Sequence, residues 1–539
     1  MTATESSSAV DQEAATVSSS SGDTTDQKPS PAQMAVDLAS EQAQFGQDPN
    51  RRCWAVIDTD GKRDALPLDS SEFQDWLNYA FYRHHGRILS QNALKEACSV
   101  LRGTTMAEGQ RIEISLRVKQ DAGELLTIDL QDERSQVVQL TPGSWSVVGA
   151  DQSRHLFYRA QGMAPLPIPN PKGDIERLRP YLNLEDQKQF WLLVIAVAFI
   201  LTGRGPFPIL LFIGEAGSGK SEAARMVRAL VDPSRVPLQT APRTDRDAMI
   251  ACSNMLMLLI DNARPFSAKE SDLLARLSTG GGLRTRRLRS DAQEQLFDVM
   301  APVLVTGIED LSTQPDLADR AVVIPFKRIG DADRRTQEEL SRQFKEDAPY
   351  ILGGLLDLIA GAWAFMPTLK PDRLPRMADF GRFGLAAEQH LGLAEGAFMA
   401  LYGNSQRQAT SGMSETDPLL SALLDFTEHL NGEWVGTAQQ LLDLLVSRVQ
   451  PAVTRQRKLW PANARSFGIK LRSLRPVLAI HGVEFENFSS GGRRLRLTVN
   501  RPNDAEAGTA EADSEQLVQR GTGDGNILDF RLSDASKVS

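Results

Sequence analysis

The sequence predicts an α/β fold built around a parallel sheet, with an α+β domain before it and a winged helix after it. Three observations support this prediction. The apolar run at 209–213 has the length of a strand and leads into a glycine-rich turn and then a helical segment. Further apolar runs alternate with helical segments as far as residue 324, as in a parallel sheet. Within residues 416–500, three helical segments precede two strands that flank Ser-Ser-Gly-Gly, which predicts a β-hairpin wing.

The glycine-rich turn matches the phosphate-binding pattern GxxxxGK[ST]. Its residues are Gly214, Glu215, Ala216, Gly217, Ser218, Gly219, Lys220 and Ser221. Glycines allow backbone N–H groups to turn toward an anion, and the following helix N-terminus adds positive potential. We expect Lys220 to reach the β- and γ-phosphates of ATP and Ser221 to bind Mg²⁺. Strand, loop and helix follow one another in the required order, which argues against a chance lysine in an ordinary turn.

Composition limits the setting in which the protein works. The net charge of -9 comes from the ends of the chain, since residues 51–500 carry only about +2 and can present basic surfaces to nucleic acid. The three cysteines are scattered, which favours a reducing, cytoplasmic compartment. The longest apolar run, 190–201, is shorter than the roughly 20 residues of a membrane span. We therefore expect a buried helix there, no membrane association and no secretory signal.

Changes in composition divide the chain into segments. The proline-rich stretch 164–171 is expected to be an extended linker at a domain boundary. The polar, acid-rich ends cannot bury enough apolar surface to fold. The predicted units are a disordered tail (1–48), an N-terminal α+β domain (50–170), a P-loop ATPase core (180–330), a helical segment (331–415), a winged-helix DNA-binding domain (416–500) and a disordered acidic tail (501–539).

Asp261 ends the apolar run 255–260, behind the phosphate-binding loop in the sequence. A carboxylate in that position usually helps to hold Mg²⁺. Asn262 follows, where many ATPases carry the glutamate that activates water, and an amide cannot act as a general base. Glu309 and Asp310 are weaker candidates for a replacement carboxylate.

Two residues at other strand ends are candidates for the reaction with ATP. Thr306 closes the run 303–306 and would orient the attacking water or sense the γ-phosphate, unless it is an ordinary strand-end threonine. Arg320 comes just before the run 321–324. An arginine there can act in trans on a neighbouring subunit's nucleotide; a plain salt bridge is the alternative.

Two basic clusters suggest contacts with nucleic acid. The first follows three glycines at 280–282 and consists of Arg284, Arg286, Arg287 and Arg289. In a ring, such a loop would form a cationic pore element for the phosphate backbone, whereas otherwise it is a solvated or subunit-bridging charge run. The second cluster lies in the predicted winged helix and could bind duplex or forked DNA. It consists of Lys470, Arg472, Arg475, Arg493, Arg494 and Arg496.

From the glycine-rich loop onward, the chain resembles superfamily 3-type helicase ATPases of the AAA+ class. The resemblance is to phage and poxvirus-type primase-helicases and to ATPases of bacterial mobile elements, and it covers roughly residues 180–500. It is carried by the loop at 214–221, the Asp261 strand, the 277–282 segment and the Asp319-Arg320 pair. The segment Leu-Ser-Thr-Gly-Gly-Gly is similar to the family's Leu-Thr-Gly-Gly-Asp motif. Three positions depart from the family: Asn262 replaces an acid, Thr306 replaces an asparagine and Gly282 replaces the motif's acid.

The resemblance implies a hexameric, ATP-driven DNA helicase or translocase that hydrolyses ATP between subunits. Single-stranded or forked DNA and a primase or loader would be its partners. A DNA-binding ATPase switch that does not unwind DNA is the alternative, and Asn262 favours it. A small-molecule kinase using the same loop is a third possibility, against which the winged helix and the arginine cluster argue.

Overall fold

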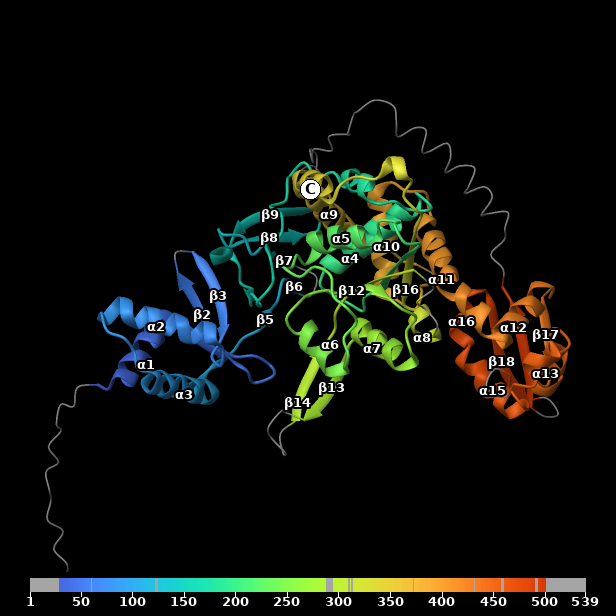
Figure 1. The fold of residues 1–539 in the computed structure, drawn as a ribbon, viewed down its shortest axis with the longest axis horizontal. Coiled ribbons are helices and arrows are strands. Elements are labelled where there is room, and N and C mark those ends of the chain that lie inside the picture. The colour runs from blue at the N-terminus through green and yellow to red at the C-terminus, as the bar shows by residue number, and fades with distance from the viewer. Residues whose placement is uncertain are drawn as a thin grey trace, which may run out of the picture.

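The computed structural model describes residues 29–500 except for 60, 122–124, 287–293, 309–310, 312–313, 372, 431, 457–459 and 490–492. Its centre is a four-stranded parallel sheet in the order β12-β15-β11-β16 (Figure 1). The strands are β11 (Ile209–Gly214), β12 (Leu258–Ala263), β15 (Val303–Gly307) and β16 (Ala321–Phe326). The predicted parallel α/β sheet is therefore confirmed.

Successive side chains along each strand point to opposite faces of the sheet, so the interior has two hydrophobic cores. Leu210 and Phe212 of β11 face one core, whereas Ile209 and Leu211 face the other, as the two-residue period of a strand requires. The helices around the sheet are α4 (Gln189–Leu201), α5 (Lys220–Val231), α6 (Asp245–Cys252), α7 (Ala268–Thr279), α8 (Pro315–Ala318), α9 (Gln337–Phe365), α10 (Ala378–Leu391) and α11 (Ala397–Thr416). Short 3₁₀ helices are η1 (Ala150–Gln152), η2 (Ile175–Tyr181), η3 (Asp331–Asp333) and η4 (Met366–Thr368).

Two apolar helices run through the first core. α4 has all its apolar residues except Trp191 buried, which confirms the buried helix expected at 190–201. Among the described helices, α9 with its 3₁₀ extension is the one long and apolar enough to cross a bilayer. Its apolar residues from Ile351 to Ala362 pack inside the same core as α4, as in the core helix of a soluble protein.

The prediction of a disordered tail over 1–48 is wrong for its last third. Helix α1 (Pro31–Gln42) begins at an N-cap, Ser30, and strand β1 (Ala43–Gln47) follows it directly. α1 buries Ala35, Leu38 and Ala39, so its short apolar stripe consists of one leucine and two alanines. The averaged composition of a long polar segment hid this short stripe. Residues 1–28 lie outside the described part of the chain.

The expected single domain over 50–170 is two units. The first has its own core and contains β1, β2 (Cys53–Thr59), β3 (Lys62–Pro67), α2 (Ser71–His85), α3 (Gln91–Glu108) and β4 (Gln110–Arg111). The second contains β5 (Ile114–Ser115), β6 (Val118–Gln120), β7 (Leu126–Asp129), β8 (Gln136–Thr141), β9 (Ser144–Gly149) and β10 (Leu156–Phe157). Leu126 and Leu140 of this sheet belong to the same core as α4 and α9. The second unit is therefore part of the central body.

The proline-rich stretch 164–171 is bonded to the central body rather than acting as a free linker. Asn170 N donates to Pro349 O at 2.9 Å, and Ala164 N donates to Pro233 O at 2.9 Å. The contact with α9 depends on Gly353, because a Cβ atom built there would lie 2.0 Å from Asn170 O. Prolines hold a segment extended, and here the extended segment follows a surface instead of crossing solvent.

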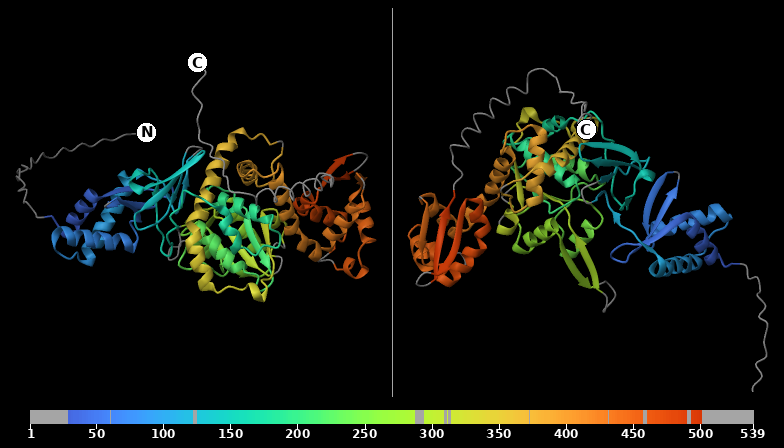
Figure 2. Two further views of the ribbon diagram at one scale, coloured as in Figure 1. Left: turned by 90° about the horizontal axis from the view of Figure 1, so that it is seen from above. Right: turned by 180° about the vertical axis from the view of Figure 1, so that it is seen from behind.

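The C-terminal unit combines helices with a three-stranded antiparallel sheet, ordered β17-β19-β18. Its elements are α12 (Pro418–Glu428), β17 (Glu433–Gly436), α13 (Ala438–Val446), α14 (Pro451–Thr454), α15 (Ala464–Ser473), α16 (Arg475–Ile480), β18 (Val483–Ser489) and β19 (Arg493–Val499). A capping box formed by Thr437 and Gln440 begins α13. This unit and the N-terminal unit lie on opposite sides of the central body (Figure 2). Residues 501–539 are outside the described chain.

Candidate nucleotide site

The loop between β11 and α5 has the backbone shape of an anion cradle. Gly217 and Gly219 have φ angles of 78° and 82°, which favour glycine. Gly214 is also constrained, since a Cβ atom there would lie 2.4 Å from Phe326 O. The loop lies at the carboxyl end of a parallel strand, where α/β sheets place their ligands. The sequence pattern 214–221 thus forms the strand, turn and helix that phosphate binding requires.

Lys220 lies within this loop, with only 7% of its surface exposed. Its Nζ donates to Glu215 O at 2.9 Å and lies 3.5 Å from Ser218 Oγ. Burial lowers the pKa of the Lys220 ammonium, and the Asp261 carboxylate partly opposes this effect. The cation is held by neutral oxygen atoms, so phosphate oxygens would be stronger partners.

Ser221, Asp261 and Thr306 meet at one carboxylate oxygen. Ser221 Oγ donates to Asp261 Oδ1 at 2.7 Å, and Thr306 Oγ1 donates to the same oxygen at 2.6 Å. Thr306 is fully buried and also accepts from Asn262 N at 2.9 Å. Its hydroxyl therefore joins the ends of β12 and β15. The structure brings the predicted serine, aspartate and threonine together.

Asn262 has the left-handed conformation, with φ 53°. The pairing of β12 with β15 shifts register between Ile260 and Ala263, so Asn262 lies at an irregularity in the strand. Asparagine tolerates this backbone region better than most residues do. The local backbone thus gives a physical reason for an asparagine at this position. Glu309 and Asp310, the weaker carboxylate candidates, lie outside the described residues.

The donor set of this site fits Mg²⁺ bound together with nucleotide phosphates. Hydroxyl and carboxylate oxygens are hard ligands, and Mg²⁺ usually takes one or two protein ligands beside phosphate and water. Ser221 Oγ and Asp261 Oδ1 supply such a pair. Among the described residues, no group of three or more His, Cys, Asp or Glu side chains could hold a metal alone.

Sequence reasoning missed the segment that covers the loop. After β16 the chain turns back, and Ile329 N donates to Gly217 O at 3.2 Å. A Cβ atom at Gly217 would lie 3.9 Å from Arg334 Nη2, and one at Gly219 would lie 3.0 Å from Ile329 Cδ1. The Arg334 guanidinium pairs with Asp331 at 3.1 Å and stays largely exposed. The basic pairs Lys327-Arg328 and Arg334-Arg335 could have drawn attention to this segment, but no sequence motif links them to the phosphate-binding loop.

Arg320 lies at the amino ends of the strands, whereas the glycine loop lies at their carboxyl ends. It directly precedes β16, and its carbonyl accepts from Ile209 N at the start of β11. Its side chain is 12% exposed, pairs with Asp316 and donates from Nη1 to Asp316 O at 2.7 Å. Its Nε is buried without a hydrogen-bond partner. Arg320 therefore cannot reach the nucleotide loop of its own chain.

The first basic cluster is carried by a β-hairpin that projects from the central body beside α6 (Figure 1). Strands β13 (Gly281–Arg286) and β14 (Glu294–Val299) pair antiparallel, so Arg284 and Arg286 belong to β13. Arg287 and Arg289 lie outside the described residues. Gly280 begins the hairpin with a φ of 82°.

The second basic cluster is partly neutralised. Lys470 pairs with Asp417 at 2.7 Å, and Arg496 pairs with Glu486 at 2.7 Å and with Glu433. Within this cluster, Arg496 is therefore paired with carboxylates of both neighbouring strands. Arg472 and Arg494 are exposed without an ion pair to another described residue, Arg475 lies over the Phe485 ring, and Arg493 belongs to β19.

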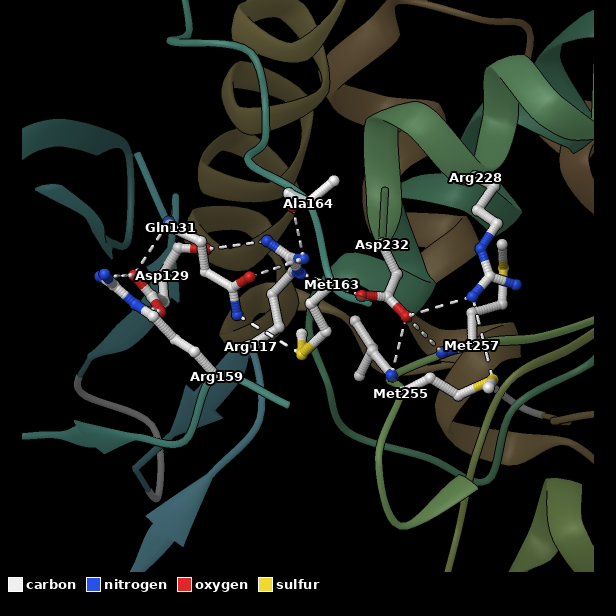
Figure 3. Close-up of polar contacts among 11 residues, drawn as sticks. Arg117, Asp129, Gln131, Arg159, Met163, Ala164, Arg228, Asp232, Met255 and Met257 are labelled. Carbon is white, nitrogen blue, oxygen red and sulfur yellow. Dashed lines mark hydrogen bonds and ion pairs between the residues drawn. The ribbon is translucent and has the colours of Figure 1, made fainter. Parts of the chain in front are cut away.

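A buried polar network lies at the other end of α5 (Figure 3). Arg117 Nε pairs with Asp232 Oδ1 at 3.0 Å, and both side chains are fully buried. Asp232 Oδ2 accepts from Leu256 N at 2.9 Å and Met257 N at 3.2 Å, just before β12. The network thus joins the small sheet, the nucleotide-loop helix and the strand that carries Asp261.

Comparison with protein families gives two matches. Residues 175–401 match the family described as actinomycete integrative conjugative element replication protein, and residues 419–513 match the RepA C-terminal domain of the same elements. Over these two segments, the chain is similar to the replication protein of an integrative conjugative element. No curated protein matches the chain.

Solved structures show a weaker likeness. The apo structure of the NrS-1 C-terminal region is 13% identical with a TM-score of 0.36, covering 88% of this chain and all of that one. The X-ray structure of JCV helicase is 14% identical with a TM-score of 0.23, covering 44% of this chain and 64% of that one. Such low scores add no argument about activity.

Proposed function

We propose that this chain is the replication protein of an integrative conjugative element and acts in the cytoplasm as an ATP-driven DNA helicase or translocase. One observation carries the proposal: Ser221, Asp261 and Thr306 converge on a single carboxylate oxygen beside a phosphate-binding loop. Loop, metal ligands and strand-end threonine are the parts that hydrolysis of a nucleoside triphosphate needs. The two family matches support a role in replication of a mobile element.

Each residue of the site has a proposed role. Lys220 would exchange the Glu215 carbonyl for the β- and γ-phosphate oxygens, and Ser221 would turn from Asp261 toward the metal. Bound Mg²⁺ would neutralise charge between the phosphates. Thr306 would position Asp261 and Asn262 through hydrogen bonds that the buried hydroxyl already makes, rather than contacting the attacking water itself.

Arg320 supports an assembly of several copies, as in a hexameric ring. It lies across the sheet from its own loop, so it can reach a nucleotide only in a neighbouring subunit. Its ion pair with Asp316 would have to open or rotate for that contact. We propose that Arg320 neutralises the γ-phosphate in trans.

The DNA contacts are proposed for two elements. The projecting β13–β14 hairpin would present its arginines to the phosphate backbone in a central pore. The C-terminal unit has the order helix, strand, four helices, strand, strand, and we propose a winged helix in which α14 and α16 are additional short helices; Arg472 and Arg494 keep exposed charge there. A primase or loader would supply the primed or opened fork.

The proposal is tested by ATP hydrolysis and strand displacement with the full chain. We expect single-stranded DNA to stimulate hydrolysis and a forked duplex to be unwound. Both activities should vanish in Arg320→Ala as well as Lys220→Ala, and mixing inactive Lys220→Ala with Arg320→Ala should restore partial hydrolysis through mixed interfaces. Electron microscopy with a slowly hydrolysed ATP analogue should show a ring. Absence of DNA-stimulated hydrolysis in the native chain would overturn the proposal.

A DNA-binding ATPase switch is the second candidate, and Asn262 favours it. The described site contains no carboxylate in the position next to Asp261, so slow hydrolysis would suit a protein that assembles on ATP without unwinding. Strand displacement separates the two functions. ATP-dependent assembly on DNA with no displacement at any protein concentration would select the switch.

A further inference from the structure

An exposed aromatic and basic surface lies at the C-terminal end of α2, in the N-terminal unit. We call it the α2 patch, formed by Tyr79, Tyr82, Arg83, Arg87 and Ile88. Tyr79 is 63% exposed, Tyr82 55% and Ile88 88%. Positions 79, 82 and 83 are neighbours on one helix face by their spacing. Large apolar and aromatic side chains at this exposure, clustered together, commonly mark an interaction site.

The fold of the unit does not need these side chains. The opposite face of α2 supplies Phe73, Leu77, Ala80 and Phe81 to the local core. Gly86 ends the helix in the left-handed conformation, and residues 87 and 88 follow outside it. The patch therefore consists of one face of the helix and the two residues that follow its C-cap, and these side chains are exposed in the described part of the chain.

The charge at this end of α2 is mainly positive. Residues 76–95 contain no aspartate or glutamate, and they carry Arg83, Arg87 and Lys95 together with two histidines; the nearest carboxylate on the same helix face is Asp75, one turn before Tyr79. Neither Arg83 nor Arg87 has an ion pair with a carboxylate among the residues that the structure describes. This contrasts with the C-terminal unit, where Lys470 and Arg496 are paired. A cationic surface without paired carboxylates favours a polyanionic ligand.

We propose that the α2 patch binds single-stranded DNA. Stacking on tyrosine rings requires unpaired bases whose faces are accessible, which a duplex hides. Exposed guanidinium groups beside the rings suit the phosphates of the same strand. This inference gives the N-terminal unit a role of its own, outside both family-matched segments, and it does not depend on ATP hydrolysis.

The first test measures binding of fluorescent oligothymidine to the full chain without nucleotide. In Tyr79→Ala/Tyr82→Ala, we expect affinity to fall at least about fivefold, the lower end of the effect for one stacked base. An abasic oligonucleotide should bind the native chain more weakly than oligothymidine does, and this difference should shrink in the double variant. The stacking proposal is overturned if native and variant chains show the same preference.

The second test concerns charge. Arg83→Glu/Arg87→Glu should weaken binding and reduce the slope of log affinity against log salt by about 0.7 for each lost phosphate contact. Arg102→Glu is the matched control, because Arg102 is an exposed cation on α3 of the same unit. We expect that variant to bind like the native chain, or far closer to it than the double variant does. If both variants lose the same affinity for DNA, net charge alone explains the effect, and the α2 patch is not the binding site.

Photo-crosslinking with a thymidine analogue locates the contact directly and separates it from the hairpin and the C-terminal unit. Crosslinked peptides covering residues 79–88 are the expected result, with the yield lost in Tyr79→Ala/Tyr82→Ala. Circular dichroism and thermal melting of each variant should match the native chain, since the substituted side chains are exposed. Crosslinks confined to other segments would overturn the proposal while leaving ATP-driven activity untouched.

Discussion

Each end of helix α5 holds a buried charged side chain, but the two side chains have different kinds of partner. At the first end, the Lys220 ammonium is held by a carbonyl and a hydroxyl of its own loop. At the last, Asp232 Oδ1 accepts from the Arg117 guanidinium and Oδ2 accepts from two backbone N–H groups. The first end is open to a ligand, whereas at the second end the chain itself supplies the partners of the Asp232 carboxylate, although Nε and Nη1 of the neighbouring Arg228 are buried without a hydrogen-bond partner.

The difference has an energetic consequence. Burial lowers the pKa of the Lys220 ammonium, so keeping this group protonated at neutral pH destabilises the folded state. The destabilisation would disappear only at a pH above the pKa of an ordinary lysine. Burial also lowers the pKa of the Arg117 guanidinium, but Asp232 and Asp129 oppose it. A site prepared for phosphate should therefore tolerate loss of its cation, whereas a closed network should not tolerate loss of its anion.

The largest expected effect is that of Lys220→Met on activity. Removing the ammonium should lower ATP hydrolysis more than about a hundredfold, since it removes a charge that phosphoryl transfer uses. The nucleotide-free protein should be at least as stable as the native chain, because a buried cation without a carboxylate partner has been replaced by an apolar side chain. Hydrolysis assays and thermal melting measure the two outcomes. Lys269→Met, at an exposed lysine, is the control; a strongly destabilised Lys220→Met would contradict the comparison.

The next effect is that of Asp232→Ala on stability. The substitution leaves Arg117 and Arg228 buried without their carboxylate and two backbone N–H groups without an acceptor. Breaking a buried pair in this way costs about 3–5 kcal/mol of the free energy of unfolding. Denaturant unfolding measures it, with Asp69→Ala as the control, whose pair with Arg52 is exposed and should matter by less than about 1 kcal/mol. Similar small losses in both variants would refute the difference between the two ends.

Sequence reasoning predicted the nucleotide-site residues at the first end of α5, but it did not predict the buried polar network at the second end. The phosphate-binding loop has a fixed spacing within eight residues, so local pattern was sufficient for Lys220 and Ser221. Asp261 and Thr306 were predicted because each is a polar residue that ends an apolar, strand-length run behind the phosphate-binding loop in the sequence. Arg117 lies 115 positions from Asp232, and no periodicity links two polar residues at such a separation.

The same limit explains the errors in domain boundaries. Helix α1 was hidden because its stripe consists mainly of alanines within a polar segment. The strands from β6 to β9 were assigned to the N-terminal domain, since sequence order does not show which core a strand joins. The sequence also did not show that Arg496 is neutralised, because Glu433 and Glu486 belong to neighbouring strands, and their pairing with Arg496 is visible only in the register of the sheet.

A smaller effect should distinguish the positioning role of Thr306. In Thr306→Val, the Asn262 N–H loses its acceptor and Asp261 loses one donor, at a cost of about 1–3 kcal/mol of stability for the unsatisfied groups. We expect hydrolysis to fall roughly tenfold as the carboxylate loses its orientation. Thr306→Ser keeps the hydroxyl and should retain most of the rate. A Thr306→Val protein with native kinetics would show that Ser221 alone orients Asp261.

The smallest effect should come from Asn262, where backbone and chemistry can be separated. Asn262→Gly suits the positive φ and removes the side chain, so it should fold normally and hydrolyse ATP at nearly the native rate if the amide contributes only shape. Asn262→Asp also tolerates this conformation and adds a carboxylate beside Asp261. If the native enzyme lacks a local general base, the aspartate should raise the hydrolysis rate a few fold and give it an acidic limb in its pH profile. If Asn262→Gly loses as much activity as Lys220→Met, the asparagine amide takes part in the reaction. The nucleotide site at the first end of α5 would then include a catalytic side chain from β12.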